Sequence, residues 1–213
     1  MAEKGILFNG DMMRAIRAGS KTQTRRPMKP QPKWMLDRYH VNKDGHPYTP
    51  IVPNSADKSR KSPYAVGDIL YCRETWKETN WMSYPGGMLC DYEGVRYRAD
   101  DELRHPMCRG MVEYKGGVPN YEDNNWRPSI HMPKEYAREW LKVTAVRAER
   151  VNDITEAGAV KEGFEQCCDG RDCGCMGKGA THGFYRTWQG VYPDSWARND
   201  WVWVTEFERT EHN

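Results

Sequence analysis

The sequence predicts a small β-barrel or another α+β fold. Three observations lead to this prediction. Several short segments have strand character, two or three short helices are expected between them, and the two kinds of segment do not alternate as in a βαβ fold. The chain has 213 residues, which is enough for a single hydrophobic core. Periodicity alone does not choose between the two fold descriptions.

The expected elements follow from runs of apolar residues and the turn residues that bound them. In chain order they are a strand at 5–9, a helix at 12–18, strands at 66–76 and 92–98, a strand at 140–151, a helix at 153–162, a short helix near 183–188 and a closing strand at 201–207. Asp11 is expected to cap the first helix, and Gly19 to end it. Asp153 and Glu156 form a capping-box-like pair for the second long helix, which Gly163 is expected to end.

The closing strand is apolar on both faces, since it reads WVWV from Trp201 to Val204. A strand of this kind is typical of one buried on two sides. Other tryptophans are candidates for lining a nucleobase pocket, although no pattern singles one out: Trp126, Trp188 and Trp196.

Composition excludes two classes of protein. No apolar run approaches the roughly 18 residues of a membrane helix, and the first residues lack the apolar stretch of a signal peptide. A fraction of 12% aromatic residues is too high for a chain that is disordered throughout. We therefore expect a soluble, cytoplasmic protein with no membrane partner, and the mean hydropathy of -0.93 indicates long polar surface loops.

Positive charge is concentrated near the start of the chain. Residues 14–61 contain 12 Lys and Arg against 3 Asp and Glu, although the whole chain has a net charge of +2. Such a segment is suited to phosphate groups of a nucleic acid. The alternative is a solvated basic loop.

A short motif in this region resembles a known family. Residues 19–26 read GSKTQTRR, which is similar to the ASCH-domain signature G-x-K-x-x-E-x-R: Gly19, Lys21 and Arg26 match it. Thr24 stands where the signature often has Glu, and a Thr there resembles the bacterial N4-acetylcytidine amidohydrolases of the same superfamily. The layout also looks like that of longer ASCH proteins from phages. The resemblance covers residues 5–26, 65–76, 138–163 and 200–208.

The resemblance implies a PUA-like small β-barrel with short peripheral helices and long loop insertions, a fold associated with RNA and modified bases. It implies one domain over residues 1–213, with insertions at about 27–63, 77–125 and 164–182. The implied activity is removal of the acyl group from N4-acetylcytidine-type nucleosides, without a catalytic cofactor. The partners expected are a small-molecule nucleoside and, as a further possibility, RNA.

The resemblance carries three catalytic residues over to this chain: Lys21, Thr24 and Glu162. A Thr hydroxyl becomes a nucleophile when a base removes its proton, and a neutral Lys is such a base if burial or a nearby cation lowers its pKa. Glu162 would donate a proton to the leaving nitrogen or position Lys21. Residues three apart in an ideal strand face opposite sides, so we expect irregular backbone at 21–24. The alternatives are a basic surface loop and a solvated Glu162.

Substrate binding is expected to involve Arg26, Glu74 and Trp76. Glu74 ends a predicted strand, where it would hydrogen-bond a base edge, and Trp76 would stack on that base. The alternative for Glu74 is a salt bridge. Two other functions stay open: a non-catalytic module that binds RNA or a modified base, and a ribonuclease in which Lys21 and Arg26 stabilise phosphate. The basic segment 14–61 suits these polymer-binding functions better than nucleoside hydrolysis.

A cluster of cysteines near the C-terminal third suggests a structural zinc ion. Its members lie within nine residues: Cys167, Cys168, Cys173 and Cys175. Thiolates in one loop suit tetrahedral zinc, with His182, Cys90 or Cys108 as further ligands. The spacing is not that of paired C-x-x-C motifs, and free thiols are the alternative. The implied hydrolase chemistry needs no catalytic metal.

Overall fold

A computed structural model shows a protein of mixed helix and sheet content in which strands predominate, which confirms the α+β class. The structure describes residues 2–32, 40–41, 47–49, 60–83, 88–100, 103–113, 126–165 and 179–211. The chain divides into two compact units. The first unit comprises Met1–Lys4, Ala15–Leu70 and Glu139–Asn213, and the second comprises Gly5–Arg14 and Tyr71–Arg138. The expected single domain with insertions stays a prediction.

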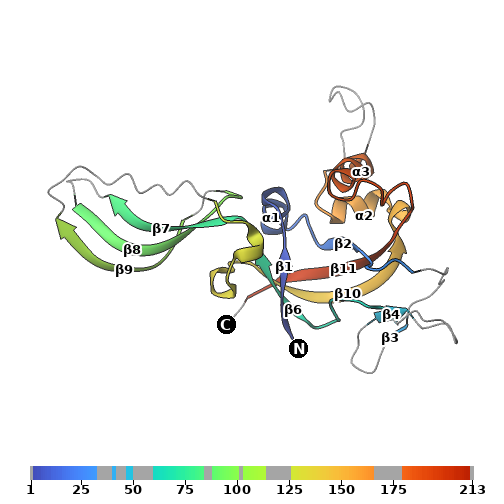
Figure 1. Cartoon of the computed structure of the whole chain (residues 1–213), viewed down its shortest axis with the longest axis horizontal. Helices are drawn as coiled ribbons and strands as arrows, with labels where there is room; N and C mark the ends of the chain where they lie inside the picture. Colours follow the sequence, from blue (N-terminus) through green and yellow to red (C-terminus); the bar gives the residue numbers. More distant parts are fainter. Residues whose placement is uncertain are drawn as a thin grey trace. The chain divides into compact units, whose positions relative to one another are not determined.

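The largest sheet has five strands in the order β1-β6-β10-β11-β2 (Figure 1). The strands are β1 (Glu3–Leu7), β2 (Gln23–Pro27), β6 (Ile69–Arg73), β10 (Trp140–Arg150) and β11 (Trp201–Thr210). β11 pairs antiparallel with β10 on one side and with β2 on the other. Within the described residues the order is open, with β1 and β2 at its two edges.

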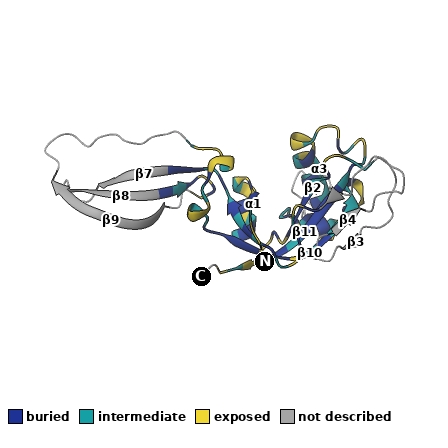
Figure 2. Ribbon diagram, turned by 60° about the horizontal axis from the view of Figure 1, so that its bottom comes forward, coloured by how far each residue is buried: buried dark blue, intermediate teal, exposed yellow. Residues whose placement is uncertain are grey.

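The register between β2 and β11 assigns the residues of β2 to opposite faces of the sheet. Gln23 and Arg25 lie on one face, and Thr24 and Arg26 lie on the other, because neighbouring residues of a strand alternate. We call these the helical face and the Thr24 face. Their partners across the strand pair are Glu206 and Val204 on the helical face, and Thr205 and Trp203 on the Thr24 face. Both faces are buried along this part of β11, as predicted, and buried residues follow β2 and β11 in Figure 2.

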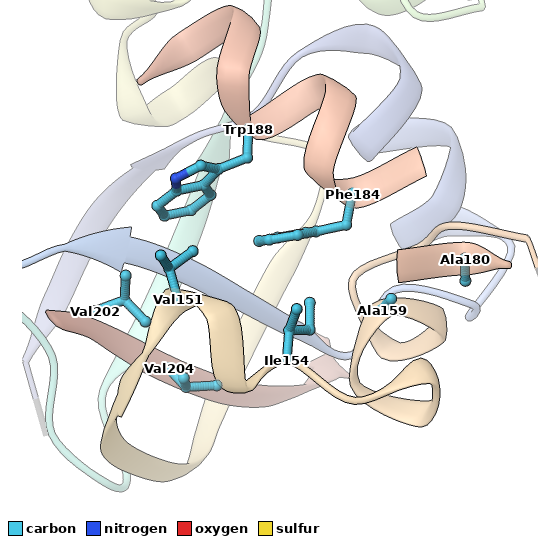
Figure 3. Close-up of a cluster of buried hydrophobic side chains, with 8 residues drawn as sticks. All are labelled: Val151, Ile154, Ala159, Ala180, Phe184, Trp188, Val202 and Val204. Atoms are coloured by element: carbon cyan, nitrogen blue, oxygen red, sulfur yellow. The ribbon is translucent and has the colours of Figure 1, made fainter. Parts of the chain in front are cut away.

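Two helices of the first unit pack against the helical face. They are α2 (Glu156–Lys161) and α3 (Ala180–Val191), and a 3-10 turn, η3 (Val151–Asp153), precedes α2. Figure 3 shows the apolar cluster that they form with β11: Val151, Ile154, Ala159, Ala180, Phe184, Trp188, Val202 and Val204. Phe184 stacks on Trp188 with ring centroids 5.3 Å apart. Each large side chain buried here stabilises the unit by about 2 kcal/mol.

The second unit contains an antiparallel sheet in the order β7-β8-β9. Its strands are β7 (Trp76–Ser83), β8 (Met88–Tyr97) and β9 (Leu103–Glu113), and two 3-10 turns follow, η1 (Ser129–His131) and η2 (Lys134–Tyr136). Most of the expected insertion at 77–125 that the structure describes is therefore regular sheet. Within the expected insertion at 27–63 there is a small sheet of β3 (His40–Val41), β4 (Pro47–Thr49) and β5 (Arg60–Lys61).

The first helix, α1 (Gly10–Arg17), ends as predicted but begins differently. Gly19 has a φ of 76°, the left-handed conformation expected after a helix end. The predicted cap at Asp11 is wrong. Asn9 caps the helix instead, because its Oδ1 accepts the Met12 N–H at 2.9 Å.

The start of α2 was also predicted at the wrong residue. Thr155 is the N-cap, and its hydroxyl accepts the Gly158 N–H at 3.0 Å. Asp153 ends the preceding 3-10 turn instead. The helix ends at Lys161, one residue before the expected end, and Gly163 follows the C-cap Glu162 with a φ of 92°, as expected of a residue that ends a helix. None of the described helices combines the length and apolar composition that crossing a bilayer requires.

Candidate active site

Lys21 lies just before β2, and its side chain is completely buried. Its backbone forms an isolated antiparallel bridge with Glu162. The amine Nζ donates to the Gln23 carbonyl oxygen at 2.9 Å, to the Glu162 carbonyl oxygen at 2.8 Å and to Glu162 Oε2 at 2.9 Å. These three acceptors match the three hydrogens of an ammonium group. The alternative of a solvated surface loop does not describe this residue.

Glu162 follows the last residue of α2 and is 4% exposed, so it is not the solvated carboxylate that the helical pattern also allowed. Gly163 ends the helix there and allows the chain to turn towards Lys21. Glu162 Oε2 accepts from Lys21, and Oε1 accepts from Arg25 Nη1 at 3.0 Å. Each oxygen already accepts from a cation. This geometry favours positioning of Lys21 over donation of a proton to a leaving group.

Burial lowers the pKa of Lys21 below its ordinary value, because an ammonium group is poorly stabilised away from water. The charge and hydrogen bond of Glu162 oppose this shift, and the nearby cations Arg26 and Arg25 lower the pKa further. An amine with a lowered pKa gives up its proton more readily than an ordinary lysine. This is the property that a general base requires.

Thr24 is 1% exposed, and its hydroxyl has no hydrogen-bond partner among the residues that the structure describes. A buried hydroxyl without a partner costs about 1–3 kcal/mol. Lys21 therefore does not bond Thr24 directly. Since the Lys21 amine binds the Gln23 carbonyl at 2.9 Å, standard backbone dimensions place it within about 8 Å of the Thr24 hydroxyl. The predicted irregular backbone is limited to residues 21–22, because Gln23 and Thr24 belong to β2.

Arg25 is a member of the site that sequence reasoning missed. It is 3% exposed and binds Glu162 through Nη1, and Glu149 Oε2 through Nη2 at 2.9 Å. Its guanidinium lies 5.8 Å from the centre of the Phe184 ring. The signature drew attention to Arg26. The signal that would have found Arg25 is strand alternation, which gives Gln23 and Arg25 a shared face.

Arg26 is half-buried and shares its face of β2 with Thr24. Its Nη1 donates to the Arg25 carbonyl oxygen at 3.3 Å. Arg26, predicted to bind substrate, therefore lies on the same face of the sheet as Thr24, the predicted nucleophile.

Glu74 and Trp76 belong to the second unit, where both are buried. Arg138 donates two hydrogen bonds of 2.8 Å to the Glu74 carboxylate. This ion pair is the alternative to substrate binding that the sequence left open for Glu74. Arg127 and Tyr136 lie 5.0 and 5.1 Å from the Trp76 ring. Glu74 is thus in this salt bridge, and contact of Glu74 or Trp76 with a base stays a prediction.

The four clustered cysteines, Cys167, Cys168, Cys173 and Cys175, lie outside the described residues. Within the described ranges, no three His, Cys, Asp or Glu side chains gather as metal ligands.

Trp188 and Trp196 contact the aromatic cluster around Phe184 on the helical face. Trp126 lies in the second unit, with the amine of Lys77 4.9 Å from its ring centre.

A cavity of about 350 Å³ opens beyond the C-terminal end of β2. It is lined by residues 27–31 and 191–195 together with Arg198 and Asp200. Lys21 and Thr24 do not line it.

Comparison of the chain with models of known protein families, with curated proteins and with solved structures gives no significant match. A functional assignment therefore depends on the residues and geometry described above.

Proposed function

We propose that the chain is an amidohydrolase that removes the acyl group from N4-acylated cytidine-type nucleosides, with an ASCH-type, PUA-like barrel as its fold. One observation supports this proposal above the others: a buried Thr24 hydroxyl without a partner among the described residues lies within about 8 Å of a buried Lys21 amine whose pKa is lowered. Folded proteins rarely keep a buried hydroxyl without a partner. Contact with substrate is one physical reason to keep such a hydroxyl, and comparison with Ser195, which also keeps one, tests whether that reason applies to Thr24.

The reaction would begin when the Thr24 proton passes through bridging water to the neutral Lys21 amine, since the amine does not bond the Thr24 hydroxyl directly. The Thr24 oxygen then attacks the acyl carbon, and Arg26, on the same face, stabilises negative charge on the acyl oxygen. The C–N bond breaks, and the protonated Lys21 returns its proton to the leaving nitrogen. Water hydrolyses the Thr24 ester and yields a carboxylate. In a second form of the reaction, Thr24 orients a water that attacks directly.

In both forms Glu162 acts through Lys21. It holds the amine with one carboxylate oxygen and its own carbonyl oxygen. For N4-acetylcytidine the products are cytidine and acetate. No cofactor enters the reaction as proposed.

A second candidate is a non-catalytic module that binds a modified base. The observation favouring it is the Lys21 amine itself, which has three acceptors and is paired with Glu162. These contacts stabilise the ammonium form, whereas a general base must be neutral. In such a module, the Thr24 hydroxyl would hydrogen-bond the ligand without reacting.

The experiment is incubation of the purified chain with N4-acetylcytidine, followed by the ultraviolet shift to cytidine and by chromatography. Thr24→Val is expected to lower kcat/KM by at least about 100-fold, the usual contribution of a proton-transfer partner or nucleophile. Ser195→Ala is the matched control, because Ser195 also has a buried hydroxyl without a partner among the described residues. It is expected to keep the wild-type rate.

Three outcomes separate the candidates. Deacetylation that depends on Thr24 supports the amidohydrolase. Binding of N4-acetylcytidine without turnover, weakened modestly by Thr24→Val, would favour the binding module. Cleavage of labelled RNA that needs Lys21 and tolerates Thr24→Ala would favour the ribonuclease alternative. Wild-type protein that leaves N4-acetylcytidine intact at stoichiometric concentration refutes the proposed activity.

A further inference from the structure

We propose that Arg25 is a positioning residue that fixes the Glu162 carboxylate and shares its negative charge with Lys21. The catalytic consequence rests on the proposed function, whereas the effect on the Lys21 amine does not. Arg25 binds Glu162 Oε1 at 3.0 Å while Lys21 binds Oε2 at 2.9 Å. All three side chains are at least 96% buried. One carboxylate therefore faces two cations in a region with little water.

This arrangement changes the balance of charge around the Lys21 amine. With Glu162 as its sole neighbour, the ammonium form would be strongly favoured, because an opposite charge at hydrogen-bond distance stabilises it. Arg25 adds a like charge nearby and takes up the other carboxylate oxygen. The charged groups that act on the amine are Glu162, Arg26 and Arg25. Arg25 thus opposes the effect of Glu162 and favours the neutral amine that a base requires.

Arg25 is also held from the side away from Lys21. Its Nη2 binds Glu149 Oε2 at 2.9 Å, and the other oxygen of Glu149 accepts from Arg147, which in turn binds Glu206. Positive and negative side chains alternate along this chain of contacts, which leads from the completely buried Lys21 to partly exposed residues. Its members are Lys21, Glu162, Arg25, Glu149, Arg147 and Glu206.

Arg25 lies on the helical face, opposite to Thr24. Its guanidinium is placed over Phe184, in the region covered by α3. It therefore acts through Glu162 and Lys21 instead of contacting the acyl group. This separates its role from that of Arg26, which shares the Thr24 face.

The test follows the Lys21 amine directly by NMR of the chain labelled with 13C and 15N in lysine, with Lys21→Arg used to assign the signal. Arg25→Gln is expected to move the titration of Lys21 upward, since a like charge has been removed. The acidic limb of the kcat/KM profile for N4-acetylcytidine is expected to move upward with it. Arg147→Gln is the matched control, because it removes a cation from the same chain of contacts without touching Glu162. In Arg147→Gln, the pH at which Lys21 titrates is expected to equal that in the wild type.

A Lys21 titration that is unchanged in Arg25→Gln overturns the proposal, whether or not the protein deacetylates anything. Absence of wild-type deacetylation refutes the proposed function, but a shifted titration would still support the role of Arg25 on Lys21. If Arg25→Gln does not fold, Arg25→Lys serves instead, since it keeps the charge but lacks the planar fork that holds Glu162 and Glu149 together. Its kcat is expected to fall about tenfold with little change in KM. An unchanged kcat in Arg25→Lys would overturn the proposal.

Discussion

Replacement of Thr24 by Val should stabilise the protein while it abolishes activity. The side chain is 1% exposed, and its hydroxyl lacks a partner among the described residues. Folding therefore removes the hydroxyl from water without replacing its hydrogen bonds, at a cost of about 1–3 kcal/mol. Val has nearly the same shape and suits a strand equally well. We expect the free energy of unfolding to rise by about 1 kcal/mol, the lower end of that range.

The same substitution at a satisfied hydroxyl provides the control. Thr155 caps α2 by accepting the Gly158 N–H at 3.0 Å. Thr155→Val should lower the free energy of unfolding by about 1 kcal/mol. Urea unfolding followed by tryptophan fluorescence measures both variants, and equal slopes against denaturant are needed for the comparison. An increase of about 1 kcal/mol corresponds to a rise in Tm of roughly 3 °C in a chain of this size.

The sign of the change in the free energy of unfolding in Thr24→Val shows whether the Thr24 hydroxyl lacks a hydrogen bond in the folded protein. A loss of more than about 1 kcal/mol in Thr24→Val would mean that the hydroxyl is hydrogen-bonded in the folded protein. The supporting observation for the proposed function would then be lost. Gain of stability combined with loss of deacetylation is what a residue kept for function produces.

Three further predictions concern the stability of the first unit. Asp68 accepts hydrogen bonds from Lys4 at 2.6 Å and from two backbone N–H groups. Burial raises the pKa of its carboxyl group, but these hydrogen bonds lower it, and the net result is a pKa below the ordinary 3.8. Asp68→Asn should therefore cost about 2 kcal/mol at neutral pH, and this difference from wild type should vanish in acid unfolding as the pH falls through the lowered pKa. Gly163→Ala should cost about 2 kcal/mol because of its positive φ, and its new Cβ would lie 2.8 Å from Ala15 Cβ. Gly190→Ala, where a Cβ meets nothing within 4 Å, should slightly stabilise α3 in the same urea assay.

The elements that could be predicted from the sequence are those specified by local signals. Gly19 and Gly163 end their helices because a left-handed residue is needed there, and glycine adopts that conformation at little cost. The strands β10 and β11 follow from runs of β-branched and aromatic residues. Glu162 was carried over from the family resemblance, and its place beside Lys21 does not depend on the helix start, which lies at a different residue than expected. The pairing of Glu162 with Lys21 across 141 positions came from the family resemblance and not from any local signal.

The features that could not be predicted depend on contacts between distant segments. Strand alternation separates Arg25 from Arg26, but the partners Glu162 and Glu149, which decide what Arg25 binds, come from other elements. The N-cap of α1 could not be chosen from the sequence for a similar reason. Asn9 and Asp11 are both good capping residues, and the direction in which the chain enters the helix decides between them. Glu74 was expected at a site because strand ends often carry such residues, and Arg138 pairs with it instead.

The polar run in β2 is the strongest physical argument that this strand is retained for function. Gln23, Thr24 and Arg25 are consecutive and at most 3% exposed, and they pair with Glu206, Thr205 and Val204 of β11, of which Thr205 is also a buried polar residue. Apolar residues in place of a buried ion pair are often neutral or stabilising, so stability alone does not account for this choice. The Gln23 amide is satisfied by the Gly158 carbonyl, and Arg25 by two carboxylates. Thr24 has no such compensation among the described residues. Under the proposed function, chemistry at Thr24 would account for the polar residues that β2 keeps at these three buried positions, beside a buried lysine.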